Sequence, residues 1–319
     1  MRHRRRGGLR PFSSITSSCV PDPTFFTRFL QTQENLIPSL QILFLDLAMK
    51  KAENRFHKRT NEELADFIKK LELQALETAE ERLPLYLKVR LKDASLILDV
   101  GCGSGFVTRD IARLTKGMVV AIDGSDSLLT VAKKILRDDA NANLCKADAE
   151  KLCFADNTFD LVTCNLLLMW ADDPQTVVNE MTRVVKPQGK VLASLEPDYG
   201  GKIHWPENKK VDLLFAGEAI RKKGGDPHIG RKLRTLFVTA GLETIIGIGN
   251  NRIWSCEEDK QYYLHSRDFY IKILKEAGLS EQEIDQWEYE FLKSLDDGVQ
   301  LNFFPQFYAI GTKREPLHG

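Results

Sequence analysis

The chain has 319 residues, of which 43% are hydrophobic and 28% charged, and its formal net charge at pH 7 is zero. This composition is that of an ordinary globular protein with enough apolar material for a sizeable core. The balanced charge argues against a global basic field of the kind that draws a whole protein to nucleic acid or to a membrane surface.

Residues 1–48 differ in composition from the rest of the chain. Five arginines and no acid precede Pro21, and serine is frequent in the same stretch. Three interpretations stay open: an organelle transit peptide, which is Arg- and Ser-rich and poor in acid, a basic tail that contacts RNA or acidic lipid, or upstream sequence ahead of a true start at Met49. We favour the last, because the composition becomes that of a globular chain from Met49 onward. Residues 36–49 are apolar but too short and too interrupted to span a bilayer.

Residues 49–92 predict an N-terminal helical segment. Thr60 and Glu63 have the spacing of a capping box, in which a side-chain oxygen and an acid three residues later cap the first turn. Apolar residues then recur at helical spacing from Leu64 to Leu71. A second, shorter helix over residues 83–91 leads into the next segment.

From Ser95 onward, short apolar runs of strand length alternate with amphipathic helical stretches. This order predicts an α/β domain: a Rossmann-like, mostly parallel seven-stranded sheet with helices on both faces. The expected strands are residues 96–100, 118–122, 143–147, 159–164, 190–195, 243–248 and 303–310. The expected helices between them are residues 106–114, 126–137, 174–185, 209–223 and 231–240.

Residues 251–300 interrupt the alternation. They predict two polar-faced helices, at residues 257–277 and 280–295, inserted before the last strand. The insertion is rich in Trp, Tyr and Phe, and we expect it to form either a lid that excludes water or a plain packing or dimer interface. The domain then comprises residues 93–250 and 301–314.

The six cysteines do not indicate a metal centre or a disulfide framework. None is part of a CxxC pair, and no His/Cys cluster has the spacing of zinc ligands. We therefore expect reduced thiols in a cytoplasmic protein without a metal site.

Residues 98–105, Leu-Asp-Val-Gly-Cys-Gly-Ser-Gly, form a glycine-rich turn between an expected strand and an expected helix. Glycines let a ligand approach the bare backbone, and the helix N-terminus offers unpaired N–H groups. The order Asp-x-Gly-x-Gly-x-Gly differs from the GxGxxG of dinucleotide-binding units, and no GxxxxGK[ST] is present. An acid in the strand, Asp99, suits a ligand with a cationic amine better than a pyrophosphate.

These motifs resemble the class I S-adenosylmethionine (SAM)-dependent methyltransferases, in particular the type 11 branch that includes quinone-biosynthesis methyltransferases. The resemblance covers about residues 93–200 and, more loosely, extends to residue 250. It implies that residues 98–105 wrap the methionine part of SAM, that Asp123 holds the ribose hydroxyls, and that Asp148 accepts from the adenine amino group. The implied cofactor-binding set is Asp99, Gly101, Cys102, Gly103, Gly105, Asp123, Asp148, Ala149 and Asn165.

The acceptor side departs from the family pattern. Residues 166–170, Leu-Leu-Leu-Met-Trp, stand where a His pair often follows the fourth strand of such enzymes. The loop after the fifth strand mixes acids, a Tyr and a His, as an acceptor pocket does. His204, Tyr199 and Asp198 are therefore weak candidates for a general base, which only acceptors that hold their proton require.

We interpret the chain as a metal-independent methyltransferase that uses SAM and acts on a small organic molecule, with no nucleic acid partner, no membrane span and a possible homodimer. Three alternatives stay open. A methyltransferase acting on a protein or nucleic acid would associate with polyanions in a salt-sensitive way. A non-catalytic SAM-binding module would bind SAM without turnover. A nicotinamide-dependent oxidoreductase is disfavoured by the glycine spacing, although likeness of fold alone does not exclude it.

Overall fold

The computed structural model describes residues 61–208, 211, 217–250, 253 and 255–315. The chain divides into two units between Ala48 and Met49, and the first unit lies outside the described residues. The predictions for residues 1–48, for the cap at Thr60 and for residues 209–210 and 212–216 of the expected helix at 209–223 therefore fall outside them as well. Within the described part, no helix is both long and apolar enough to cross a membrane.

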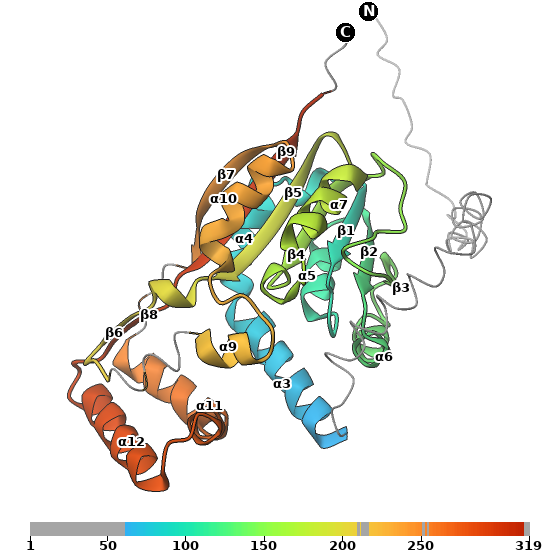
Figure 1. The fold of residues 1–319 in the computed structure, drawn as a ribbon. Helices are drawn as coiled ribbons and strands as arrows, with labels where there is room; N and C mark the ends of the chain where they lie inside the picture. Colours follow the sequence, from blue (N-terminus) through green and yellow to red (C-terminus); the bar gives the residue numbers. More distant parts are fainter. Residues whose placement is uncertain (1–60, 209–210, 212–216, 251–252, 254, 316–319) are drawn as a thin grey trace, which may run out of the picture. The chain divides into compact units, whose positions relative to one another are not determined.

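A seven-stranded sheet with the order β3-β2-β1-β4-β5-β9-β7 forms the centre of the domain (Figure 1). Strands β1 to β5 pair in parallel, and β9 is antiparallel to both of its neighbours. The predicted fold class, an α/β domain with a mostly parallel seven-stranded sheet, is confirmed. The strands are β1 (Leu96–Val100), β2 (Met118–Asp123), β3 (Ala142–Lys146), β4 (Phe159–Asn165), β5 (Val185–Pro197), β7 (Leu242–Asn250) and β9 (Gln306–Lys313).

Helices cover both faces of this sheet, and buried aliphatic side chains of the strands pack beneath them. One face carries the N-terminal helix α4, together with α5 and α6, and the other carries α7 and α10, as Figure 1 shows. Strands β1 and β4 have almost no exposed side chain, as expected for strands covered on both sides. The helices are α4 (Ala79–Lys88), α5 (Phe106–Leu114), α6 (Asp126–Ile135), α7 (Pro174–Val184) and α10 (Ile229–Thr239).

Local chemistry explains where these helices begin. The Ser125 side chain accepts from the Leu128 N–H at the start of α6, and Asp173 accepts from Gln175 and Thr176 at the start of α7. Pro174 then occupies the first turn of α7, where its missing N–H costs no hydrogen bond. These side chains satisfy backbone groups that a helix start leaves unpaired.

The N-terminal helix α3 (Asn61–Glu77) packs against α4 and α5. The 251–300 segment forms α11 (Cys256–Glu276) and α12 (Glu281–Asp296), each begun by a capping box, at Ser255 and Ser280. The two helices pack on each other around Tyr263 and Trp287. The helical insertion before the last strand is thus present.

A second, two-stranded sheet was not expected. It pairs β6 (Ile203–Trp205) with β8 (Leu301–Phe303), so the run at 303–310 contains the end of one strand and most of another. Pro305 explains the break, because proline lacks the N–H needed for a continuous ladder. The remaining short elements are the 3-10 turns η1 (Leu91–Asp93), η2 (Leu168–Trp170) and η3 (Tyr199–Gly201), and the helix α9 (Ala219–Lys222).

Candidate cofactor and acceptor site

The glycine-rich turn joins β1 to α5 at the carboxyl end of the sheet. Gly101, Gly103 and Gly105 all have positive φ, at 73°, 54° and 84°, a region that L side chains rarely adopt. A Cβ on Gly101 would lie 2.6 Å from the Leu167 Cδ1, so the Leu167 side chain would have to move to admit one. The sequence therefore needs glycine here, and bare backbone faces any ligand at this edge.

Asp123, at the end of β2, connects the glycine turn to the start of α6. Its Oδ2 accepts from the Gly103 N–H at 2.9 Å and its Oδ1 from the Ser125 N–H at 2.8 Å. Desolvation raises the pKa of this carboxyl, although the backbone hydrogen bonds oppose the rise. The structure thus places Asp123 directly beside Gly103, and each of its oxygens retains capacity for a further donor.

Asp99 lies behind the turn, with only 2% of its surface exposed. Its Oδ2 accepts from the Thr108 hydroxyl of α5 at 2.6 Å. Burial raises its pKa to about 7, against the lowering effects of the Thr108 hydrogen bond and the Arg82 charge. This geometry braces α5 against β1, and Thr108 is a contributor that sequence reasoning missed.

Asp148 and Ala149 follow β3, and the neighbouring Ala147 N–H donates to the Asp123 backbone carbonyl at 3.2 Å. Asp148 turns back on Lys151 through an isolated bridge and accepts from the Glu150 N–H. The turn at Asp148 therefore lies next to the end of β2, where Asp123 is located.

Asn165 and Cys102 complete the predicted set. Cys102 is buried in the turn, and burial raises the pKa of its thiol. Asn165 ends β4 beside the glycine turn, and its Oδ1 accepts from the Ser194 hydroxyl at 2.9 Å. The structure thus gathers the predicted cofactor residues at the ends of β1, β2, β3 and β4.

Glu196, a buried carboxylate on β5, was not predicted as a site residue. It accepts the N–H groups of Leu167, Leu168 and Met169 in the loop after β4, at 3.0, 2.9 and 3.3 Å. Desolvation raises its pKa to about 7, against these hydrogen bonds. In the sequence it was one acid among several in residues 194–207, and nothing there distinguished it.

The N-terminal helices contribute to the same end of the sheet. Leu71 of α3 lies 3.9 Å from where a Cβ on Gly103 would be. Arg82 of α4 is fully buried and donates to the Asp110 carboxylate at 2.7 Å and to the Ala75 carbonyl at 2.8 Å. In the sequence, nothing distinguished Arg82 from an ordinary surface arginine on a helix, so its burial and its bond to Asp110 were not predicted.

Asp198, a weak base candidate, forms a bidentate ion pair with Arg231, at 2.6 and 2.7 Å. Burial raises its pKa, but Arg231 and His228 outweigh that effect and hold the pKa below the usual range. A carboxylate held this way is a poor proton acceptor, and the geometry suits bracing of the loop after β5.

Tyr199 and His204 lie further along the chain after β5. The Tyr199 ring contacts Phe304 at 4.8 Å between centroids, and burial together with the nearby Tyr262 phenol raises its pKa to about 12. His204 lies on β6, with its ring stacked 6.4 Å from Phe291 of α12. Tyr199 begins η3, two residues after the end of β5, and His204 lies five residues beyond it on β6.

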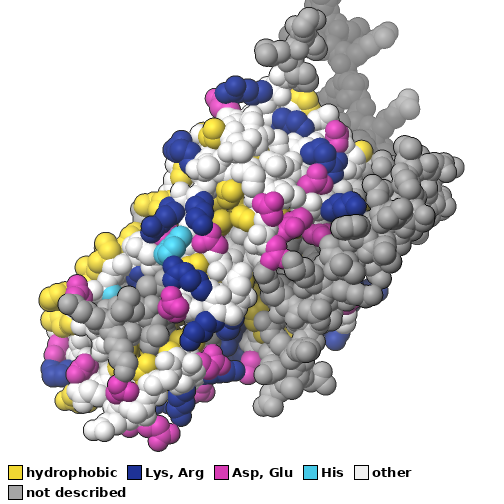
Figure 2. All heavy atoms as spheres, viewed as in Figure 1, with side chains coloured by type: hydrophobic (Ala, Val, Ile, Leu, Met, Phe, Trp, Pro, Cys, Tyr) yellow, Lys and Arg dark blue, Asp and Glu magenta, His cyan; other side chains and the backbone are white. Residues whose placement is uncertain are grey.

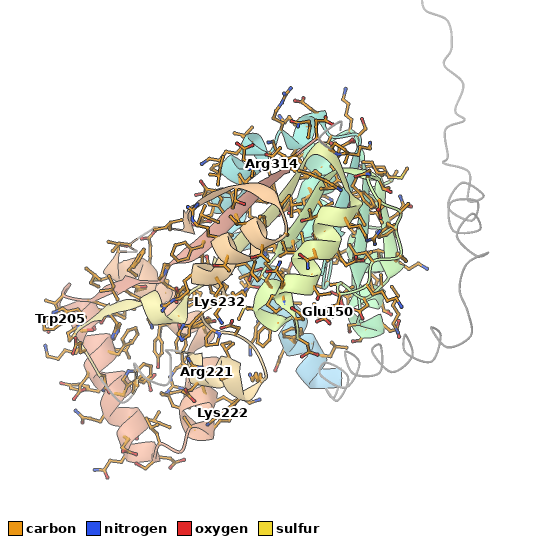
Figure 3. The ribbon with its side chains drawn as sticks, turned by 45° about the horizontal axis from the view of Figure 1, so that its top comes forward. Glu150, Trp205, Arg221, Lys222, Lys232 and Arg314 are labelled. Carbon is orange, nitrogen blue, oxygen red and sulfur yellow. The ribbon has the colours of Figure 1, made fainter. Side chains whose placement is uncertain are left out.

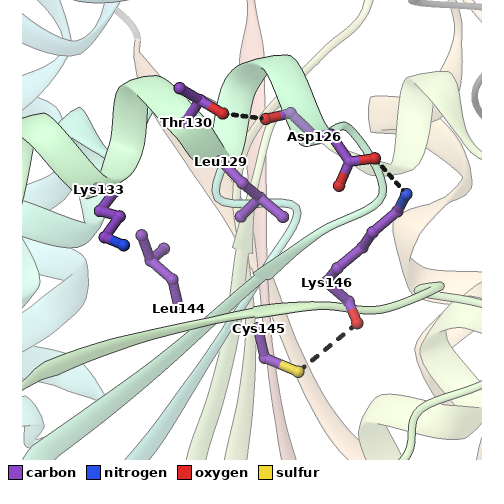
Figure 4. A pocket seen from close by; sticks show the side chains of 7 residues that line it. All are labelled: Asp126, Leu129, Thr130, Lys133, Leu144, Cys145 and Lys146. Carbon is purple, nitrogen blue, oxygen red and sulfur yellow. Dashed lines mark hydrogen bonds and ion pairs between the residues drawn. The ribbon is translucent and has the colours of Figure 1, made fainter.

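An open surface hollow lies on the flank of α6 and β3 (Figure 4). A Lys146–Asp126 ion pair of 2.5 Å borders it. Its lining shares no residue with the candidate cofactor set, so we do not assign it to the site. The lining residues are Asp126, Leu129, Thr130, Lys133, Leu144, Cys145 and Lys146.

Comparison with known proteins agrees with this geometry. Residues 98–193 match a family model described as a methyltransferase domain. An uncharacterized methyltransferase of Schizosaccharomyces pombe is 33% identical over 206 residues, which are 61% of this chain and 73% of that protein. A structure from Bacillus halodurans, of a protein proposed to be a methyltransferase, matches with a TM-score of 0.51 and 20% identity. It covers 73% of this chain and 98% of that one, and it supports the fold alone.

Two further relatives carry different activities in their names. The ubiquinone/menaquinone biosynthesis C-methyltransferase UbiE of Cronobacter sakazakii is 33% identical over 140 residues, 40% of this chain and 55% of that protein. The mitochondrial arginine-hydroxylase NDUFAF5 of Mus musculus is 31% identical over 159 residues, 48% of this chain and 44% of that protein. The chain thus spans only about half of each of these two relatives.

The sheet order, the glycine turn and the strand-end acid define a class I methyltransferase fold. The chain belongs to the SAM-dependent methyltransferase family, since the fission-yeast relative exceeds 30% identity over most of its own length. It is a methyltransferase of class EC 2.1.1.-, and its methyl donor is SAM.

Proposed function

We propose that the protein transfers the methyl group of SAM to a small organic acceptor. The observation that carries this proposal is the proximity of aromatic and acidic side chains from three separate elements, α3, η3 and α11. Tyr270 of α11 lies within electrostatic range of Tyr199, Tyr262, Asp259 and Glu77, and desolvation raises its pKa well above the usual value. Aromatic rings and sparse polar groups that converge from several elements are typical of small-molecule sites.

For the cofactor, we propose that Asp123 binds the two ribose hydroxyls and that the backbone of residues 101–105 lies along the methionine part. Two observations support this fit: the positive φ angles of Gly101, Gly103 and Gly105 favour residues without a side chain, and Asp123 has acceptor capacity left beside Gly103. Asp148 and Ala149 would face the adenine, and Asn165 the transferred methyl.

SAM supplies an electrophilic methyl group on a sulfonium, and the remaining work is positioning. Alignment of two reactants can be worth an effective molarity of roughly 10⁵ M or more. The chain provides this through the fixed turn at 101–105 and the loop after β4. Tyr199 is the candidate that lies best placed to orient an acceptor, since it follows the end of β5.

The cofactor assignment is tested by calorimetric titration with SAM, S-adenosylhomocysteine (SAH) and NADH. We expect micromolar binding of the first two and none of NADH. Asp123→Ala should weaken SAM binding more than tenfold, because two hydroxyl hydrogen bonds are lost, while the melting curve still shows a folded protein. Asp126→Ala, which breaks only the exposed pair with Lys146, is the matched control. Equal affinity of Asp123→Ala and wild type would overturn the ribose assignment.

A macromolecular acceptor is the second candidate, and one surface favours it. Figure 2 shows Lys and Arg side chains around a histidine on one face, and Figure 3 places Arg221, Lys222 and Lys232 together there. Acids neutralise part of this charge, as in the Arg221–Glu218 and Lys232–Asp226 ion pairs. Because these charges are paired, we consider a macromolecular acceptor less well supported than a small-molecule acceptor.

One experiment separates the two candidates. A cell extract is incubated with the protein and methyl-labelled SAM, and is then divided into small-molecule, protein and nucleic acid fractions. Label in the small-molecule fraction supports the proposal, and label in a macromolecular fraction would replace it. SAM binding without any label would support a non-catalytic SAM-binding module.

Cytoplasmic location, a homodimer and the absence of a nucleic acid partner stay proposals. The support for cytoplasmic location is the unpaired state of the described cysteines, which fits a reducing compartment. Fractionation of cells that express the full chain, together with light scattering, would test location and oligomeric state.

A further inference from the structure

Glu196 is a buried carboxylate to which the assignments above give no task. It is 0% exposed and lies on β5, yet it makes no described ion pair with Lys or Arg. Its Oε1 accepts from Leu167 and Leu168, and its Oε2 accepts from Met169. A buried carboxylate is costly unless donors satisfy it, and here the donors are backbone groups of a single loop.

An irregularity in β5 aims this side chain at the loop. The register between β5 and β9 shifts between Ala193 and Glu196, and Leu195 has a φ of 58°. A regular strand would alternate its side chains between the two faces, and a bulge with positive φ redirects the next residue. Left-handed backbone at a leucine is strained, and such strain concentrates where a particular geometry is needed.

The loop that Glu196 holds is also strained, and it reaches the glycine turn. Leu166, at the start of the loop, has a φ of 53°. The next residue, Leu167, fills the space that a Cβ on Gly101 would occupy, with its Cδ1 only 2.6 Å from that position. A continuous set of contacts therefore runs from the Glu196 carboxylate through the loop to the turn assigned to SAM.

We propose that Glu196 is a positioning residue, whose carboxylate fixes residues 167–169 as one wall of the SAM site. This inference rests on the proposed placement of SAM at residues 101–105. Glu196 itself touches neither reactant, and it acts through Leu167. Loss of the hydrogen bonds from residues 167–169 to the Glu196 carboxylate lets this loop move, and cofactor binding weakens.

Asp160 offers a matched comparison elsewhere in the same sheet. It too accepts backbone N–H groups, from Ser95 and Leu96 at 2.9 Å each, and it also pairs with Lys186. It lies near the start of β4, at the opposite edge of the sheet from the glycine turn. A merely structural role for Glu196 would make the two carboxylates equivalent in their effect on SAM binding.

The test measures SAH affinity by calorimetry for Glu196→Gln and Asp160→Asn, with the melting temperature of each. Glutamine keeps one acceptor oxygen but turns an NH₂ group toward the Met169 N–H. We expect Glu196→Gln to weaken SAH binding about tenfold and Asp160→Asn to leave it unchanged, although both melt lower. Equal effects of the two variants on affinity would overturn the inference.

A double-mutant cycle tests the route through Leu167. Leu167→Ala removes the side chain that contacts the turn, so Glu196→Gln should cost little further affinity in that background. Additive losses would overturn the inference. If wild type binds no SAH at all, the cofactor assignment fails instead, and the two failures are thereby distinguished.

Should Glu196→Gln not fold, pH replaces the substitution. Protonating Glu196 below about pH 7 should weaken SAH binding several-fold in wild type and less in Leu167→Ala. Cys164 is the thiol that the Glu196 charge affects, and Asp99 and Asp123 also have raised pKa values. These groups are common to both proteins, so only the difference between the two pH profiles counts. Identical profiles would overturn the inference.

Discussion

The cofactor end and the acceptor end of the molecule are built in different ways. At the cofactor end, the glycine turn and Asp123 come from adjacent βα units, and backbone N–H groups make the decisive contacts. At the proposed acceptor end, Glu77, Tyr199 and Tyr262 come from three distant parts of the chain, and burial together with the neighbouring side-chain charges raises the pKa of both tyrosines. A site of the first kind leaves a local sequence signature, and a site of the second kind does not.

The difference extends to what each end tolerates. Positive φ angles and close contacts specify glycine at the cofactor end, so few residues fit there. The proposed acceptor end consists of aromatic rings and carboxylates held by side-chain packing. There, substitutions that conserve volume cost little stability. Substitutions at the proposed acceptor end should therefore cost less stability than substitutions in the glycine turn.

A pair of glycine substitutions tests most strongly whether the two ends differ in this way. Gly105 and Gly241 have nearly equal φ, 84° and 82°, but a Cβ on Gly105 would lie 3.1 Å from the Ala132 Cα, and nothing lies within 4 Å at Gly241. We expect Gly105→Ala to lower the free energy of unfolding by about 2–5 kcal/mol, from backbone strain plus overpacking.

Gly241→Ala is the matched control and should cost only about 1–2 kcal/mol, the strain alone. Urea unfolding measures both losses, and SAH titration of the folded variants should show weaker binding for Gly105→Ala only. Equal losses of stability would mean that the turn at 101–105 is no more constrained than an ordinary helix end.

A smaller effect should appear in the pH dependence of stability. Burial raises the Asp99 pKa from 3.8 to about 7, so the folded state binds more protons than the unfolded state between those values. Its contribution to stability is therefore full below about pH 4 and is lost as pH rises to about 7. We expect a slope on the order of 1 kcal/mol per pH unit from this group.

Asp99→Asn, which still accepts the Thr108 hydroxyl, should flatten that slope. Urea unfolding at several pH values between 4 and 8 measures it. Asp160 has a lowered pKa and therefore titrates below this pH range, so Asp160→Asn should leave the slope unchanged and serves as the control. An unchanged slope in Asp99→Asn would show that this carboxyl is not the buried acid of the cofactor end.

Local chemistry explains how much of the structure the sequence predicted. The bounds of β1 and α5 were predicted to the residue, because a buried apolar strand, a glycine turn and an amphipathic helix follow one another without ambiguity. The Asp173–Pro174 start of α7 was equally clear. Asp123 was identifiable as a candidate because a strand end is a local feature.

What the sequence did not reveal depends on contacts between distant segments. The β6–β8 sheet joins short strands about 100 residues apart, and neither run has a strong alternation of its own. Glu196 is aimed by a bulge that no residue pattern marks, and Arg82 is buried only because α4 packs on the sheet. Asp198 was a weak candidate for a general base in the sequence, and its pairing with Arg231 of α10 could not be read there.

The smallest expected effect concerns the segment outside both ends of the site. If residues 1–48 are not part of the folded domain, a chain that begins at Met49 should match the full chain in melting temperature and in SAH affinity. The reason is that the composition becomes that of an ordinary globular chain from Met49 onward. Differential scanning calorimetry and SAH titration of the two chains side by side make the comparison.

A melting temperature several degrees lower in the shorter chain would show that residues 1–48 pack on the domain. A loss of SAH affinity at equal stability would instead show that part of residues 1–48 contributes to the cofactor end. That end would then not be built from adjacent βα units alone.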